Sequence, residues 1–150
     1  MKIVVSVPLL LALGLTTPTA FAEEIKSNKC AIDPDTGNAA TCEFVDQEVE
    51  SQVYFEYSLP ESGKKRFSFD CNFQTKDSAK KSHTAFIGGG GNLSVDHRVS
   101  PISIAPNGHA VIYGDAKATD DNREAQLKFT QVTGRPSPGD AIVCTMATAQ

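Results

Sequence analysis

The chain has 150 residues, of which 40% are hydrophobic and 21% are charged, and its formal net charge at pH 7 is −4. A chain of this length forms a single domain with one core. The acidic balance argues against a general nucleic-acid binder, which would be basic. The 8 prolines, 11 glycines and absence of tryptophan favour strands and turns over helices.

Residues 1–22 have the pattern of a secretory signal peptide. Lys2 gives a positive start, an apolar run covers 3–15, and Ala20-Phe21-Ala22 is the small-x-small motif that precedes a cleavage site. We therefore expect cleavage after Ala22, one domain over 23–150, and a secreted or periplasmic location. The apolar run is too short for a permanent anchor, so no membrane span is expected.

Four cysteines behind an export signal predict two disulfides, because oxidising compartments form and keep such bonds. Three pairings are possible. We favour Cys30–Cys42, whose partners are separated by a turn-rich segment, together with Cys71–Cys144, whose partners lie on the two most core-like strands. Cys71–Cys144 would then bridge two sheets. With all thiols paired, a cysteine nucleophile is not expected.

The stretch 67–73 predicts the central strand of the domain. Three phenylalanines and Cys71 share one side of this strand, while Ser68, Asp70 and Asn72 share the other, because side chains in a strand alternate between faces. Such an apolar face needs a second layer to cover it. We therefore expect this strand in the middle of one sheet, packed on another.

Short strands separated by turn signals recur along the whole chain. The predicted strands are 41–45, 53–59, 67–73, 84–87, 93–96, 102–105, 110–113, 125–130 and 141–147. Turns at 60–63 and at Asn107-Gly108 predict two hairpins, the first joining 53–59 to 67–73 and the second joining 102–105 to 110–113. This pattern predicts an antiparallel two-sheet β-sandwich of immunoglobulin-like architecture, with a small β-barrel as the alternative.

Two turn-like motifs each have a functional and a structural interpretation. Gly88–Gly91 could surround an anion with backbone N–H groups, but no Gly-Lys-Ser/Thr ending or helix follows, so a flexible loop between strands is favoured. Asp33–Asn38 resembles part of a calcium loop. Its glycine is one position early and its closing glutamate is missing, so a turn closed by a disulfide is favoured.

The histidines form no motif along the sequence. His83, His97 and His109 are 14 and 12 residues apart, which matches no paired metal-ligand pattern. Ser94, Asp96 and His97 contain the residue types of a catalytic triad without a nucleophile elbow or an oxyanion loop. Surface histidines are the favoured interpretation, and we predict neither a catalytic nor a metal site.

Charges are segregated along the chain. Basic residues gather at Lys64, Lys65, Arg66, Lys76, Lys80 and Lys81, after acidic residues at Glu43, Asp46, Glu48 and Glu50. The favoured interpretation is that these lysines protect strand edges from aggregation. The alternative is that they steer a charged partner, such as an acidic glycan or a lipid headgroup, to one end of the domain.

These observations favour an exported, non-enzymatic binding or interaction module without a cofactor, with a protein or a surface glycan as its partner. It could be associated with virulence. We expect contact through the segments 84–92, 116–124 or 74–81, because rigid sandwiches present loops at their ends. One alternative is a secreted effector or elicitor of a eukaryotic microbe, since 54–73 and 139–147 resemble segments of fungal disulfide-bonded β-barrel elicitors. A small secreted hydrolase is a further alternative.

Overall fold

The computed structural model describes residues 27–44, 51–75, 83–96, 102–104, 109–132, 136–137 and 139–150. These ranges contain ten strands and no helix, which confirms the all-β prediction. Accordingly, they include no helix long and apolar enough to cross a membrane. The strands are β1 (Ser27–Ala31), β2 (Ala40–Glu43), β3 (Ser51–Ser58), β4 (Gly63–Gln74), β5 (His83–Gly91), β6 (Leu93–Val95), β7 (Ile102–Ile104), β8 (His109–Ala118), β9 (Glu124–Val132) and β10 (Ala141–Thr148). The predicted signal peptide lies outside the described residues.

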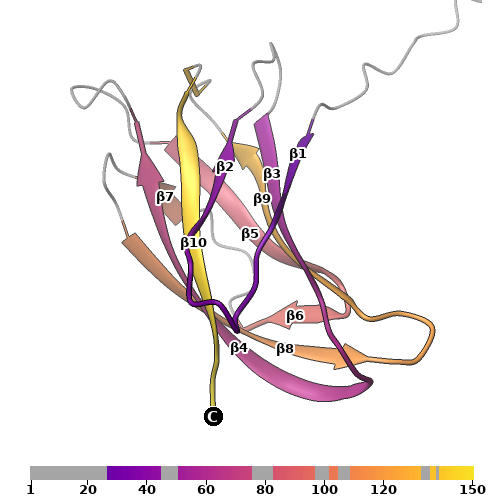
Figure 1. Cartoon of the computed structure of the whole chain (residues 1–150). Coiled ribbons are helices and arrows are strands. Elements are labelled where there is room, and N and C mark those ends of the chain that lie inside the picture. The colour runs from indigo at the N-terminus through magenta and orange to yellow at the C-terminus, as the bar shows by residue number, and fades with distance from the viewer. Residues whose placement is uncertain are drawn as a thin grey trace, which may run out of the picture.

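The strands form two sheets, and consecutive described strands always lie in different sheets. The odd-numbered strands form one sheet in the order β1-β3-β9-β5-β7, and the even-numbered strands form the other in the order β2-β10-β4-β8-β6 (Figure 1). We call them the odd sheet and the even sheet. Neighbouring strands are antiparallel except β1, which runs parallel to β3. Within the described ranges no pairing joins the sheets at their edges, so they form a sandwich and not the closed barrel.

Both predicted hairpins are wrong. The strands β3 and β4 do not pair with each other, because β3 pairs with β1 and β9 whereas β4 pairs with β10 and β8. The short connection at 59–62 instead carries the chain across the sandwich, where the Tyr57 and Phe67 rings meet at 5.7 Å. In the same way β7 pairs with β5 and β8 pairs with β4 and β6. Two consecutive strands that each have one apolar face bury these faces equally well when they pair as a hairpin and when they lie in opposite sheets.

The prediction that 67–73 forms a central strand is confirmed. β4 lies third of five in the even sheet, between β10 and β8. Phe67, Phe69, Cys71 and Phe73 are at most 3% exposed and face the side chains of the odd sheet. The facing apolar side chains come mainly from β3 and β9, among them Val53, Phe55, Leu127 and Phe129. The core is therefore the space between the two sheets.

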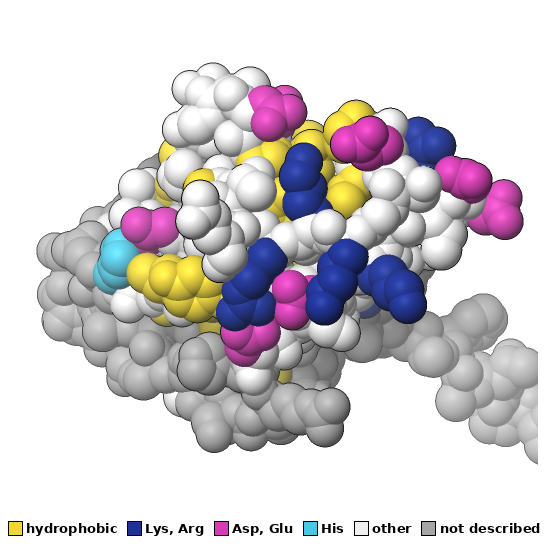
Figure 2. Space-filling view, turned by 90° about the horizontal axis from the view of Figure 1, so that it is seen from below, with side chains coloured by type: hydrophobic (Ala, Val, Ile, Leu, Met, Phe, Trp, Pro, Cys, Tyr) yellow, Lys and Arg dark blue, Asp and Glu magenta, His cyan; other side chains and the backbone are white. Residues whose placement is uncertain are grey.

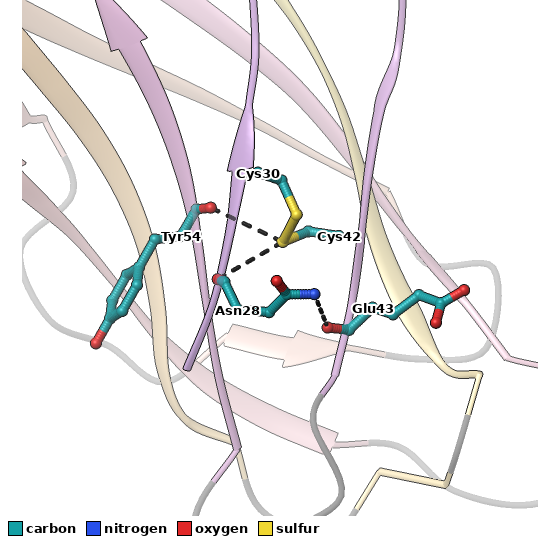
Figure 3. Close-up of a disulfide and its surroundings, with 5 residues drawn as sticks. All are labelled: Asn28, Cys30, Cys42, Glu43 and Tyr54. Carbon is teal, nitrogen blue, oxygen red and sulfur yellow. Dashed lines mark hydrogen bonds between the residues drawn. A yellow bond between two sulfur atoms is a disulfide. The ribbon is translucent and has the colours of Figure 1, made fainter. Parts of the chain in front are cut away.

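The two disulfides of the structure are Cys30–Cys42 and Cys71–Cys144, the pairings favoured from the sequence. The role expected for Cys71–Cys144 is wrong, because its cysteines lie directly opposite each other on β4 and β10, within the even sheet. It is Cys30–Cys42 that joins the two sheets, at their β1 and β2 edges (Figure 3). The path also differs from an immunoglobulin sandwich, in which consecutive strands such as F and G share a sheet.

The β1–β2 edge is held by more than its disulfide. The Asn28 side chain donates a hydrogen bond from Nδ2 to the carbonyl oxygen of Glu43, at 3.1 Å. The Cys42 sulfur, which carries no proton in a disulfide, lies 3.7 Å from the carbonyl oxygen of Asn28 and 3.8 Å from that of Tyr54 (Figure 3). β1 was not predicted as a strand, since no residue of it is fully buried.

The glycine run is part of a strand, and its prediction as a flexible loop is wrong. Residues 88–91 end β5 and pair with Lys128 to Ala125 of β9. A Cβ atom on Gly89 would lie 2.0 Å from the carbonyl oxygen of Leu93, and Gly91 has a φ of +59°. The missing side chains therefore let β6 pack against the end of β5, where the chain turns into the even sheet.

Substitution of Gly89 tests this explanation. We expect Gly89→Ala to lower the free energy of unfolding by about 1–3 kcal/mol, because a backbone atom must move to admit the methyl group. Gly88→Ala is the matched control: a Cβ atom there meets nothing within 4 Å, so a change within about 0.5 kcal/mol is expected. Chemical denaturation measures both variants. Equal effects would contradict the close-packing explanation.

Candidate functional site

The two histidines whose backbone the structure describes lie in different sheets. His83 begins β5 in the odd sheet and His109 begins β8 in the even sheet, while His97 lies outside the described residues. Asp96, beside His97, forms an ion pair with Arg66. Among the described residues, no group of three or more histidine, cysteine, aspartate or glutamate side chains could hold a metal ion.

The turn that resembles a calcium loop is stabilised by its own side chains. The Asp33 carboxylate accepts a hydrogen bond from the backbone N–H of Asp35, at 2.8 Å. The Thr36 hydroxyl accepts one from the backbone N–H of Asn38, at 3.2 Å. Aspartate and threonine commonly stabilise turns in this way, which explains why these residue types occur here.

The three segments expected to act as contact loops are largely strand or outside the described residues. Residues 84–91 belong to β5, and 116–118 belong to β8, which leaves only 119–123 as a connection. Gln74 ends β4, and 76–81 lie outside the described residues. A candidate contact surface therefore has to be sought on the sheets.

The outer face of the even sheet, along β4 and β8, carries such a surface. Alternation places the core-facing residues of both strands inside, so the intervening residues point outward. We call this surface the β4–β8 face. It consists of Lys64, Arg66, Ser68, Asp70 and Asn72 of β4 with His109, Val111, Tyr113, Asp115 and Lys117 of β8. Seen from below in Figure 2, hydrophobic side chains lie between a histidine and a group of lysine and arginine side chains.

Two hydrophobic side chains occupy the middle of the β4–β8 face. Val111 is 43% exposed and Tyr113 is 42% exposed, and they are the exposed large hydrophobic residues of the described chain. They lie two residues apart on one strand, so they point to the same side. They therefore form one continuous apolar patch on an otherwise polar surface.

Arg66 holds one side of this patch in place. Its guanidinium forms ion pairs with Asp96 and with Asp115, the latter at 3.1 Å, and lies 5.6 Å from the centre of the Tyr113 ring. The hydrogen bond to Asp96 is the main cause that raises the pKa of Arg66. Four residues from β4, β8 and the end of β6 are thereby linked, which restricts the orientation of Tyr113.

The opposite side of the patch carries a pair formed by a histidine and an aspartate. His109 Nε2 contacts the carboxylate of Asp70 across β8 and β4, with both side chains more than half exposed. In the register, Asp70 lies opposite Val111 and Asn72 lies opposite His109. Along the strand direction, the apolar patch is therefore bordered by Arg66 and Asp115 on one side and by His109 on the other.

The outer face of the odd sheet is organised differently. Glu56 binds Lys29 at 3.3 Å and accepts a hydrogen bond from Gln126 at 2.8 Å. Lys128 lies 5.4 Å from the centre of the Tyr54 ring, and Tyr54 is only partly exposed. This face presents a network of polar side chains and no exposed large hydrophobic residue among those described.

Comparisons with known proteins give no relative for this chain. No protein-family model matches it, and no curated protein and no solved structure gives a significant match. The β4–β8 face itself is therefore the basis for proposing a function.

The sequence contains a signal for this face that the strand prediction did not use. Ala110, Val111, Ile112 and Tyr113 are consecutive apolar residues, and a strand can bury only every second one in a two-layer fold. Ile112 is buried at 2% exposure, so its neighbours must point outward. Only the pairing of β8 with β4 shows whether Ala110 and Ile112 or Val111 and Tyr113 face the core.

Proposed function

We propose that the protein is an exported, non-enzymatic binding module whose β4–β8 face contacts the partner. The observation that carries the proposal is the exposed Val111–Tyr113 patch between the Arg66 ion pairs and the His109–Asp70 contact. Specific interfaces combine an apolar centre with a polar rim, and tyrosine and arginine are frequent among the residues that dominate binding. Tyr113 and the Arg66 beside it provide both residue types at one point.

Export is supported by the cysteines and by the N-terminus. Both disulfides of the structure are typical of an oxidising, extracytoplasmic environment, and residues 1–22 fit a signal peptide. The partner is therefore expected outside the cytoplasm, as a protein or a surface glycan. It belongs either to the producing cell itself or to a host that this cell colonises.

The test is a capture experiment with matched variants. Immobilised oxidised wild type, Tyr113→Ala and Tyr54→Ala are exposed to envelope and secreted extracts, and bound protein and bound sugar are both quantified. Wild type and Tyr54→Ala should retain the same partner. Tyr113→Ala should lose at least tenfold in retention, since a central aromatic contributes strongly to an interface. Tyr54 is the control because it lies on the outer face of the odd sheet.

Three outcomes would contradict the proposal. The first is capture that depends on Tyr54 and not on Tyr113. The second is equal capture by all variants. The third is the absence of any partner together with turnover of a hydrolase substrate panel, which would favour the small-hydrolase alternative. A host-cell response to the protein that depends on Tyr113 would favour the effector or elicitor alternative, with the same face in contact.

A further inference from the structure

The positive charge at one end of the β4–β8 face is arranged in an unusual way. Lys64 of β4 and Lys117 of β8 lie directly opposite each other in the register, and both side chains are exposed. Like charges in this position repel and destabilise a strand pair. β4 is the central strand of the even sheet, but its pairing with β10 covers only Phe67 to Gln74, so edge protection by Lys64 stays a prediction. Edge protection does not by itself require a second lysine directly opposite the first.

The carboxylates beside this pair of lysines already have side-chain partners. Asp96 and Asp115 bind Arg66, and Asp70 contacts His109. Among the described residues, no carboxylate forms an ion pair with Lys64 or Lys117. The next row of the sheet after the two lysines holds Arg66 opposite Asp115, whose carboxylate is already bound. The two ammonium groups thus remain available to an external anion.

We propose that Lys64 and Lys117 together bind the sulfate or carboxylate group of an acidic glycan that lies along the β4–β8 face. This inference rests on the proposed function and specifies its ligand. An oxyanion between the two ammonium groups would replace their repulsion by two attractions. The protein carries a net charge of −4, so a local cationic pair selects where an anionic chain docks.

The remainder of the face offers groups that suit a sugar chain. Ser68, Asp70 and Asn72 form a row of short polar side chains along β4 that can exchange hydrogen bonds with hydroxyl groups. Tyr113 offers an exposed aromatic edge beside this row. From Lys64 to Asn72 the strand extends roughly 26 Å at about 3.3 Å per residue. A peptide binding by strand addition needs an open sheet edge, and the β4 residues from Ser68 to Asn72 are paired on both sides.

The test is an NMR titration of the oxidised protein with four probes. These are a heparin-derived oligosaccharide, an oligogalacturonate, a neutral oligoglucan of equal length and inorganic sulfate. Backbone amides of Lys64, Tyr113 and Lys117 should shift with at least one acidic oligosaccharide and not with the neutral one. The double variant Lys64→Gln/Lys117→Gln should lose at least tenfold in affinity. Its thermal midpoint should be unchanged or higher, because the repulsion is removed.

Lys65→Gln is the matched control. Lys65 carries the same charge on the same strand but lies opposite Ala116. Its side chain belongs to the other face of the sheet because it directly follows Lys64. The affinity of its variant should therefore stay within about twofold of the wild type. Equal losses in both variants would show an unspecific charge effect and overturn the inference. Inorganic sulfate that binds as tightly as the oligosaccharides would also overturn it, because the sugar would then contribute nothing.

Failure of the inference is distinguishable from failure of the proposed function. If no acidic oligosaccharide binds while capture still depends on Tyr113, the face binds a partner of another chemistry and only the glycan inference fails. If neither the titration nor the capture gives a signal that depends on this face, both fail.

Discussion

Replacement of Phe69 by alanine is expected to lower the free energy of unfolding by about 3–5 kcal/mol. Phe69 is 1% exposed and lies on β4 between Met146 of β10 and Ile112 of β8. Its ring therefore fills the centre of the space between the two sheets, and truncation leaves a cavity that rigid strands cannot close. Domains of this size are stable by only about 5–15 kcal/mol, so the loss should be visible in urea or thermal unfolding.

Tyr113→Ala is the control for Phe69→Ala. It removes an aromatic ring from the neighbouring strand β8, but on the outward side, where the ring is 42% exposed. A change within about 1 kcal/mol is expected, since substitutions away from the core usually have small effects. If Tyr113→Ala were as destabilising as Phe69→Ala, the assignment of inner and outer faces in the even sheet would be wrong.

Removal of the Cys71–Cys144 disulfide is expected to cost about 4 kcal/mol of stability. Its cysteines are 73 residues apart, and in the loop-closure account a bond that closes a longer loop removes more entropy from the unfolded chain. The variant Cys71→Ala/Cys144→Ala therefore loses more than Cys30→Ala/Cys42→Ala, whose cysteines are 12 residues apart and for which about 3 kcal/mol is expected.

The comparison of the two disulfide variants also reports on their places in the fold. Loss of Cys71–Cys144 leaves β4 and β10 paired by their backbone hydrogen bonds, so the sheet order should persist in the folded fraction. Loss of Cys30–Cys42 releases the edge where β1 meets β2, so hydrogen exchange should rise at residues 28–31 first. A reversed order of the two stability losses would contradict the loop-closure account.

Most strands were predictable because their local signal is strong. The alternation in 53–59, 67–73 and 125–130 identifies both the strand and the side that is buried. The structure buries the apolar residues on that side. β1 was not predicted, because it has no fully buried residue and is held by its pairing with β3, its disulfide and Asn28. Those contacts come from segments distant in sequence and leave no local pattern.

The arrangement of the strands was not predictable from the same signals. A turn such as 59–62 reverses the chain whether the next strand pairs beside the first or crosses to the opposite sheet. Here consecutive described strands always lie in different sheets, so both predicted hairpins are wrong and Cys71–Cys144 lies within a sheet. The sequence predicts a loop at Gly88–Gly91 because it does not show why glycines are needed there. They are needed because Leu93 closely approaches Gly89 in the folded chain.

The candidate face could not be predicted from the sequence, for a related reason. Val111 and Tyr113 become a surface patch only when β8 pairs with β4 and turns Ile112 inward. Arg66 joins them from a segment 47 positions earlier in the chain, and its partner Asp96 lies 30 positions from it. Sequence alone placed Arg66 in a basic cluster of uncertain role. The pairing places Arg66 beside the Tyr113 ring and Lys64 opposite Lys117.

The most direct test of the central claim is site-specific photo-crosslinking. A benzophenone amino acid replaces Tyr113 in one variant and Tyr54 in another, and each is irradiated in the presence of the extract or glycan that the wild type binds. The binding-module account predicts a crosslinked product from position 113 and none from position 54. A product from position 54 alone would place the contact on the odd sheet and contradict the claim that the β4–β8 face is the binding surface.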